Sequence, residues 1–294
     1  MREIRVVWAL LSADAIAIFV TYSRLPPAET YHVSLSGFAG GASRVVVFVC
    51  FPGALVAIAI LGLVVERLHR GWARPVSLVA LLLCASVAWP GVVDQADLDV
   101  KWSNAFAAVG VLIVLVLSVL ARRSGWWPAP SRVGDRARLA VGAAAALLAA
   151  PWIAAELGFF LDGVPMLGSV YITGKIARVA GGGHMHAVHH GHHHGLDGLL
   201  LTLTGLLLSR RLGSVRGRRL RALLGAYLAL MLVYGLTNMV NDAWDEQIFK
   251  RDWTNWLVPG VLQPKASLAW AAMLVAAALV YAAFLARRPL LGRR

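Results

Sequence analysis

Residues 45–66 read VVVFVCFPGALVAIAILGLVVE, an apolar run with no charged side chain before its final Glu66. A helix needs about 20 consecutive apolar residues to cross the roughly 30 Å hydrocarbon core of a bilayer. This run meets that length, so we predict a transmembrane helix. Comparable apolar runs occur at residues 6–23, 74–93, 103–121, 138–160, 189–209, 221–241 and 266–286. The sequence therefore predicts an all-α, polytopic transmembrane helical bundle of about eight spans, built as a single integral membrane domain over residues 1–294.

The overall composition agrees with a bilayer as the solvent for most of the chain. Hydrophobic residues make up 59% of the sequence and charged residues only 15%, whereas about a quarter of the residues in a soluble domain are charged. The first apolar run continues past a short stretch at residues 13–15 that resembles a signal-peptide cleavage site, so we expect an uncleaved first span. The two cysteines, Cys50 and Cys84, form no CxxC pair, which argues against a cysteine metal site.

Basic residues fall mainly on one side of the predicted membrane. Of the 28 lysines and arginines, 20 lie in the two termini and in the connections 67–74, 122–138 and 210–221. Because basic residues gather on the cytoplasmic side, we predict that both termini are cytoplasmic and that the chain is a multi-pass protein of the cell membrane. The net charge of +13 then reflects topology and contact with anionic lipid headgroups, and we expect no nucleic-acid binding.

A dense histidine cluster precedes the sixth apolar run. Seven of the nine histidines lie within residues 184–194, which read HMHAVHHGHHH. The purely apolar part that follows, Leu199 to Leu208, covers only about half of a crossing. If this segment spans the bilayer, its helix has to begin near His189 or earlier. Several imidazoles would then lie below the extracytoplasmic surface, inside the bundle.

Helical spacing suggests that these side chains share a metal ion. On a helix with 100° per residue, His186, His190, His193 and Asp197 fall on one narrow face. Imidazoles at i and i+4 with a nearby carboxylate suit Zn²⁺, Ni²⁺, Cu²⁺, Co²⁺ or Fe²⁺. We therefore predict an extracytoplasmic divalent transition-metal site formed by His186, His189, His190, His193, His194 and Asp197. A loose, metal-gathering or pH-sensitive loop is the alternative interpretation, because several glycines interrupt the cluster.

The seventh apolar run ends in polar residues on the same predicted side. Asn238, Asp242 and Asp245 recur at i, i+4 and i+7, so they share a helical face. Since a short connection makes the sixth and seventh spans antiparallel neighbours, a site with ligands from both is geometrically plausible. The alternative is that Asp242 and the acids after it are simply solvated residues beyond the span.

Further polar residues within the apolar runs extend the predicted site into the membrane. Asp14 lies near the middle of the first run, and Glu156 lies near the extracytoplasmic end of the fifth. An intramembrane carboxylate is a functional candidate by default, although a protonated or hydrogen-bonded structural role is the alternative. The predicted transport path comprises Asp14, Thr204, Tyr234 and Asn238.

Three short stretches resemble motifs of known membrane-protein families. Residues 186–190 (HAVHH) resemble the histidine boxes of membrane di-iron desaturases and hydroxylases, and residues 241–245 (NDAWD) resemble the start of the acidic box of membrane aromatic prenyltransferases. Residues 194–198 (HGLDG) are similar to a signature of nickel permeases, which would imply metal transport. The sequence departs from the last two patterns at Phe249 and Gly198, which replace an aspartate and a histidine, so no family is assigned.

These patterns leave three functional hypotheses open. The first is a protein that binds and transports a transition metal. The second is a membrane-embedded metalloenzyme that acts on a lipid or isoprenoid substrate at the outer leaflet, with Glu156, Asp242 and Asp245 as further ligands or catalytic bases. The third is a non-catalytic membrane subunit that binds a partner or heme. The expected partners are the lipid bilayer and a metal ion or lipid-like substrate, and the sequence indicates no oligomeric state.

Overall fold

The computed structural model describes residues 1–24, 33–68, 70–89, 92, 97–123, 127–156, 176–178, 184–186, 193–249, 251–262 and 264–286. The fold is all-α apart from one pair of three-residue antiparallel strands. The elements are α1 (Arg2–Arg24), α2 (Gly37–Phe48), η2 (Val49–Gly53), α3 (Ala54–Val64), η3 (Val65–Arg67), α4 (Ala73–Ala85), η4 (Ser86–Ala88), α5 (Asn104–Arg123), α6 (Asp135–Glu156), β1 (Ile176–Arg178), β2 (His184–His186), α8 (His193–Ser209), η5 (Leu212–Ser214), α9 (Arg218–Trp244), η6 (Asp245–Phe249), α10 (Leu268–Val280) and η7 (Tyr281–Leu285).

A helix occupies each of the eight predicted apolar runs. Within the described ranges, six helical segments are long and apolar enough to cross a membrane: Arg2–Arg24, Gly37–Arg67, Asn104–Arg123, Asp135–Ala154, Arg218–Phe249 and Leu268–Leu285. The remaining two apolar helices, Ala73–Ala88 and Gly195–Ser209, are shorter. The apolar helices are therefore compatible with a multi-pass integral membrane protein, and six candidate spans are fewer than the eight that the sequence predicts.

The segment that decides the fold is one nearly continuous helix with a π-turn inside it. Pro52 lies within η2, between α2 and α3. Proline has no N–H to donate and its ring clashes with the preceding turn, so a local change of helical hydrogen bonding is expected there. The helix nevertheless continues through α3, most of whose residues are fully buried. Its apolar residues thus form the centre of the bundle.

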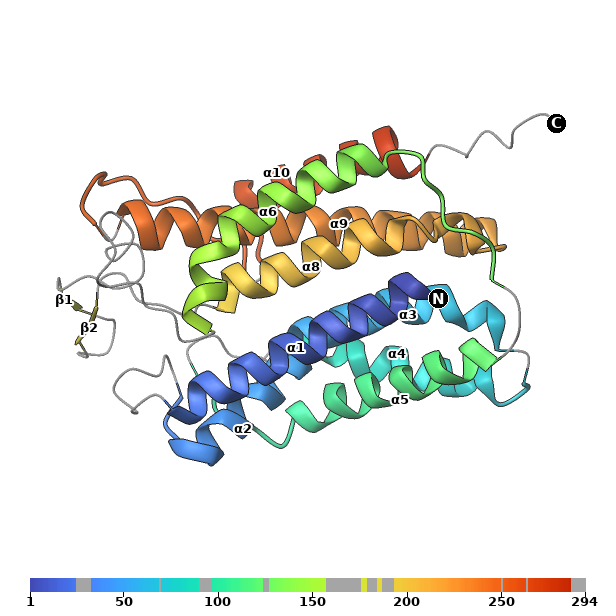
Figure 1. Cartoon of the computed structure of the whole chain (residues 1–294), viewed down its shortest axis with the longest axis horizontal. Helices are drawn as coiled ribbons and strands as arrows, with labels where there is room; N and C mark the ends of the chain where they lie inside the picture. Colours follow the sequence, from blue (N-terminus) through green and yellow to red (C-terminus); the bar gives the residue numbers. More distant parts are fainter. Residues whose placement is uncertain are drawn as a thin grey trace.

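The helices form two groups that pack on each other. In Figure 1, α1 to α5 make up one group, and α6, α8, α9 and α10 make up the other. Helix α3 contacts α4 and α5 in its own group and α8 and α9 in the other. One hydrophobic core therefore runs through both groups, and it includes Ile60 from α3, Leu201 from α8 and Leu228 from α9.

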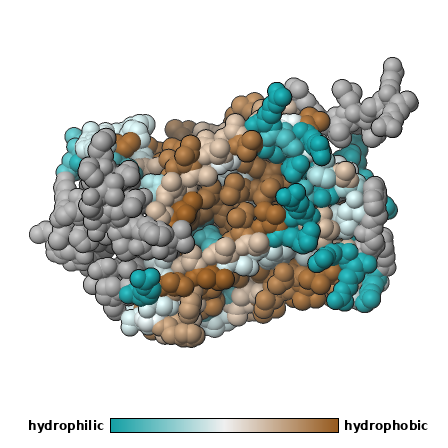
Figure 2. Space-filling view, in the orientation of Figure 1, coloured by the Kyte–Doolittle hydropathy of each residue, from teal (hydrophilic) through white to brown (hydrophobic). Residues whose placement is uncertain are grey.

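The outer faces of the helices are apolar, as a bilayer environment requires. Large side chains such as Leu82, Leu112 and Leu147 are exposed on these faces. Figure 2 shows a broad hydrophobic band across the middle of the molecule, with hydrophilic residues gathered at one end. Since contiguous apolar surface of this extent is rare on soluble monomers, the surface suggests a lipid bilayer around the helices.

The two ends of the bundle differ in composition. We call the end where Glu3, Arg138, Arg210 and Arg211 lie the arginine end, and the end where α8 begins and α9 finishes the histidine end. Figure 1 shows the start of α1 and the finish of α10 at the same end, which is the arginine end. An even number of crossings, as predicted from the sequence, requires this placement.

Candidate functional site

Helices α8 and α9 are antiparallel neighbours in direct contact, as the sequence predicted. Small residues allow their backbones to approach closely. A methyl group added at Gly198 would lie 2.6 Å from the Gly235 carbonyl oxygen, and one at Gly205 would lie 3.2 Å from the Leu228 carbonyl oxygen. Such small residues are typical of helix contacts in membranes, where close packing replaces hydrophobic driving force. The position of α8 along α9 is therefore fixed over several turns.

The first turn of α8 is held by an acid from α9. The backbone N–H of Gly195 donates a hydrogen bond to Asp242 Oδ2 at 3.1 Å, and both residues are buried. The first N–H groups of a helix have no partner within it, and the helix dipole favours negative charge at this position. Asp242 therefore acts as a capping group that comes from the neighbouring helix.

The same turn is closed on its other side by α6. The Trp152 ring packs directly on Gly195, where an added methyl group would lie 2.4 Å from Trp152 Cε3. Trp152 forms a small second core with Ala145, Ala149 and Met239. Gly195 is therefore a close-packing residue whose partner on α6 is Trp152.

Asp197 faces the interior of the bundle. It shares a helical face with Leu201 and Leu208, which belong to the main core, and its own exposed fraction is only 9%. The residue after it, Gly198, packs against Gly235, which follows Tyr234 on α9. The structure therefore brings together two of the predicted site residues, one from each helix.

Two threonines on α8 also place hydroxyl groups in the protein interior. Thr202 and Thr204 are fully buried. Within the part of the chain that the structure describes, neither Oγ1 atom has a hydrogen-bond partner, and the same holds for Trp152 Nε1. Because unsatisfied buried polar groups are costly, such atoms mark positions where water or an ion could bind.

Tyr234 and Asn241 hold a non-helical segment against α9. The Tyr234 hydroxyl donates to the Leu262 carbonyl at 2.8 Å, and Asn241 Nδ2 donates to the Val258 carbonyl at 3.0 Å. Trp244 Nε1 donates to the Trp256 carbonyl at 2.9 Å. Residues 256–262 therefore run back along α9, and their backbone carbonyls receive side-chain donors where helical hydrogen bonds are absent. Asn238, by contrast, donates to the Tyr234 carbonyl of its own helix.

Two of the five predicted histidine ligands lie outside the described residues, and three are described by their backbones. His189 and His190 lie outside the described residues. His193 and His194 open α8 and His186 ends β2, but the structure describes only their backbones, as it does for Glu156. Among the described side chains, no group of three or more His, Cys, Asp or Glu residues is arranged to hold a metal ion.

Two further predicted acids lie on α1 and at the end of α9. Asp14 lies near the middle of α1 and is half-buried. Asp245 begins η6, just beyond α9, and is also half-buried. Both remain candidates for the roles that the sequence predicts.

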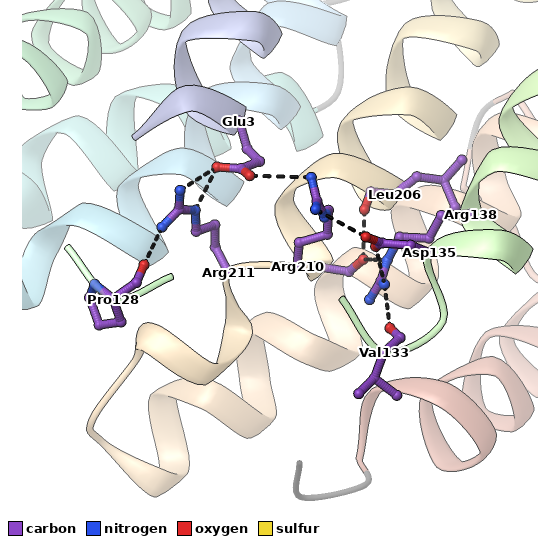
Figure 3. Close-up of polar contacts among 9 residues, drawn as sticks. Glu3, Pro128, Val133, Asp135, Arg138, Leu206, Arg210 and Arg211 are labelled. Atoms are coloured by element: carbon purple, nitrogen blue, oxygen red, sulfur yellow. Dashed lines mark hydrogen bonds and ion pairs between the residues drawn. The ribbon is translucent and has the colours of Figure 1, made fainter. Parts of the chain in front are cut away.

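The arginine end contains a buried ion-pair network that the sequence analysis did not identify (Figure 3). Glu3 Oε2 accepts from Arg211 Nε at 2.6 Å, and the two side chains are 4% and 6% exposed. Arg211 Nη1 also donates to the Pro128 carbonyl at 2.6 Å. Burial and the positive charge of Arg211 lower the pKa of the Met1 amino group to about 6. The ion pair between Glu3 and Arg211 joins the start of α1 to the connection after α8.

A second acid extends the network to α6. Arg210 Nη2 lies 3.0 Å from Asp135 Oδ2, and Arg138 Nη1 lies 3.1 Å from Asp135 Oδ1. Arg210 Nη1 also reaches Glu3 Oε1 at 3.4 Å. On the neighbouring connection, Glu66 accepts backbone N–H groups of residues 216 and 217 at 2.6 and 2.8 Å. The arginines that the sequence analysis used only for topology therefore also tie the loops together.

One local feature of the sequence pointed to an ion pair at Glu3, although not to its partners. Glu3 is the only acid in the N-terminal basic segment, so it was a plausible partner for an arginine elsewhere. Its actual partners lie more than 200 residues away in sequence, which no spacing rule reaches.

Comparisons of the chain with protein-family models, with curated proteins and with solved structures find no match.

Proposed function

We propose that this chain binds a divalent transition metal at the histidine end and transports it across the membrane. The observation that carries the proposal is the contact between Gly195 and Asp242, because it joins α8 and α9 where the chain leaves the histidine cluster. The contact holds the first turn of α8, which His193 and His194 open, against α9, with the buried Asp197 one turn further along α8. A metal site needs a ligand-bearing segment that neighbouring groups hold in place, and this contact would supply that support.

The donor set suits the ions that prefer nitrogen ligands. Imidazole nitrogens with one carboxylate oxygen are typical ligands of Zn²⁺, Ni²⁺, Cu²⁺, Co²⁺ and Fe²⁺. The proposed metal ligands are His186, His189, His190, His193, His194 and Asp197. An imidazole must be neutral to bind a metal, so binding should weaken as the pH falls below the ordinary histidine pKa of about 6.5.

The proposed path continues along the buried polar side chains. Thr204 lies on the same helical face as Asp197, and its hydroxyl is buried. Tyr234 and Asn238 contribute polar atoms from α9, and Asp14 contributes a carboxylate from α1. Since Tyr234 and Asn238 donate hydrogen bonds to backbone carbonyls, a passing ion would have to displace those bonds or use the remaining oxygen atoms.

The proposal includes the predicted topology. With the arginine end in the cytoplasm, the histidine cluster faces the extracytoplasmic side of the cell membrane. Cysteine residues introduced at each end and labelled with a membrane-impermeant thiol reagent test this orientation. Labelling of a cysteine at the arginine end in intact cells would contradict it.

Metal uptake tests transport directly. Cells or vesicles containing the protein are supplied with radioactive Ni²⁺ or Zn²⁺, and a variant with His190→Ala and His193→Ala is compared with the original chain. We expect uptake to fall at least tenfold. His69→Ala, a histidine outside the cluster, is the control. Unchanged uptake in the double variant would refute the transport proposal.

Metal retention separates the transporter from the metalloenzyme. A transported ion should leave the purified protein on mild chelation. A stoichiometric metal that resists chelation, together with no uptake, would instead support the enzyme hypothesis, in which Glu156, Asp242 and Asp245 act on a lipid or isoprenoid substrate.

A further inference from the structure

We propose that Asp242 is a positioning residue, which fixes the histidine-bearing first turn of α8 without binding the metal itself. This inference rests on the proposed metal site. Its basis is the hydrogen bond from the Gly195 N–H to Asp242 Oδ2 at 3.1 Å, between two buried residues. Because His193 and His194 immediately precede Gly195, any shift of this N–H moves their backbones as well.

Neighbouring helices pack closely around the first turn of α8. Trp152 fills the space beside Gly195, as the 2.4 Å approach to a methyl group shows. One turn further along, a methyl group at Gly198 would lie 2.6 Å from the Gly235 carbonyl oxygen and 2.7 Å from Met239 Cγ. The turn is thus held by α6 on one side, by the α9 backbone on the other and by Asp242 at its start.

The chemistry of the contact favours a capping role over a ligand role. A carboxylate at the start of a helix satisfies an N–H that has no partner within the helix, and it is stabilised by the helix dipole. Asp242 Oδ2 accepts a hydrogen bond from the Gly195 N–H, and Asp242→Asn separates this role from metal binding by the same carboxylate. Asp197 lies on the next turn of α8 and reaches the interior independently, so it remains the carboxylate of the proposed ligand set.

Two substitutions distinguish positioning from ligation. Asp242→Asn keeps an oxygen acceptor for the Gly195 N–H but removes the charge that a metal ligand supplies. Asp242→Ala removes both. If Asp242 positions the turn, the alanine variant should lose about tenfold in Ni²⁺ or Zn²⁺ affinity, equivalent to about 1.4 kcal/mol, and the asparagine variant should stay within threefold. Asp252→Asn is the control, since Asp252 is exposed with a φ of 59°, a conformation that asparagine tolerates.

A second readout follows the turn without metal. His194→Cys introduces a thiol at the turn, while the native Cys50 and Cys84 are buried and should react slowly. We expect Asp242→Ala to raise the labelling rate of this thiol at least threefold, and Asp242→Asn to leave it nearly unchanged. A protein that binds no metal but shows this labelling pattern would refute the proposed function and the metal part of this inference, and would retain Asp242 as the cap.

The contact can also be disturbed from the α8 side, should Asp242→Ala fail to fold. Gly195→Ala forces the turn away from Trp152 and should reproduce the labelling and affinity changes. Adding Trp152→Ala restores the space and should reverse both. Equal loss of affinity in Asp242→Asn and Asp242→Ala, with unchanged labelling, would overturn the inference in favour of ligation. Unchanged affinity and labelling in both variants would overturn it outright.

Discussion

The two ends of the bundle are held together by different physical means. At the arginine end, long charged side chains such as Glu3 and Arg211 reach across loops and form buried ion pairs. At the histidine end, the contacts are between backbones, through Gly198 and Gly235, and between single side chains and backbone groups, as for Asp242. The ion pairs at the arginine end fix which loops lie together. The backbone contacts at the histidine end fix the position of α8 along α9.

This difference suggests a division of roles. A buried ion pair is costly to break, because removing one partner leaves the other charge without compensation in the interior. Helix contacts through glycine add little polar energy but allow polar side chains to be placed with precision. We therefore expect substitutions at the arginine end to lower stability most, and substitutions at the histidine end to lower stability less and to affect metal binding as well.

The largest expected effect is at Glu3. Glu3→Gln leaves Arg211 without its carboxylate, and loss of one partner of a buried pair costs about 3–5 kcal/mol. Thermal unfolding of the protein in detergent measures it. Asp135→Asn is the matched comparison, because the Asp135 side chain is 37% exposed and its ion pairs with Arg138 and Arg210 are more screened. Equal losses for the two variants would contradict the importance of burial at Glu3.

The next effect is at the contact between α8 and α9. Gly198→Ala places a methyl group 2.6 Å from a backbone oxygen that cannot move aside easily, and overpacking of this kind costs about 1–3 kcal/mol. Gly213→Ala is the control, since nothing lies within 4 Å of a methyl group there. If both variants unfold at the same temperature as the original chain, the close approach of the two helices is wrong.

A smaller effect is expected where α9 holds the non-helical segment. Tyr234→Phe removes one hydrogen bond to the Leu262 carbonyl, and such a bond contributes about 0.5–1.5 kcal/mol. Hydrogen exchange of residues 256–262 should become faster, with little change in the helices. Asn241→Ala should likewise make hydrogen exchange faster near Val258. Unaltered exchange in both variants would show that these donors do not hold the segment.

The smallest effect concerns an exposed ion pair. Lys101 Nζ lies 3.1 Å from Asp97 Oδ2, with side chains 35% and 47% exposed. Exposed pairs of this kind contribute about 0–1 kcal/mol and are screened by salt. Lys101→Ala should therefore shift the unfolding temperature far less than Glu3→Gln. A comparable shift would remove the contrast between buried and exposed pairs.

The helices could be predicted from the sequence because hydropathy is a local property. Each of the eight apolar runs contains a helix, with ends that differ from the prediction by several residues. One clear difference is α9 with η6, which continues as far as Phe249 although its apolar run stops near Asn241. Polar residues of this extension have partners that hydropathy does not reveal: Asp242 contacts α8, and Asn241 donates to the Val258 carbonyl.

The site was predicted less completely than the fold. The short connection between the sixth and seventh spans correctly indicated that Asp197 and Asp242 come from neighbouring helices, because such a connection favours antiparallel packing. It gave no indication that Tyr234 would donate to Leu262, since that contact depends on how the chain folds back after α9. The Glu3 network was missed for the same reason: its partners are distant in sequence and adjacent only in the folded bundle.

Metal content of the detergent-purified protein tests the central claim most directly. Elemental analysis after exposure to Ni²⁺ or Zn²⁺ should find about one ion per chain, and His190→Ala with His193→Ala should remove most of it while leaving the unfolding temperature nearly unchanged. Absence of bound metal from the original chain, or equal binding by the double variant, would contradict a metal site at the histidine end.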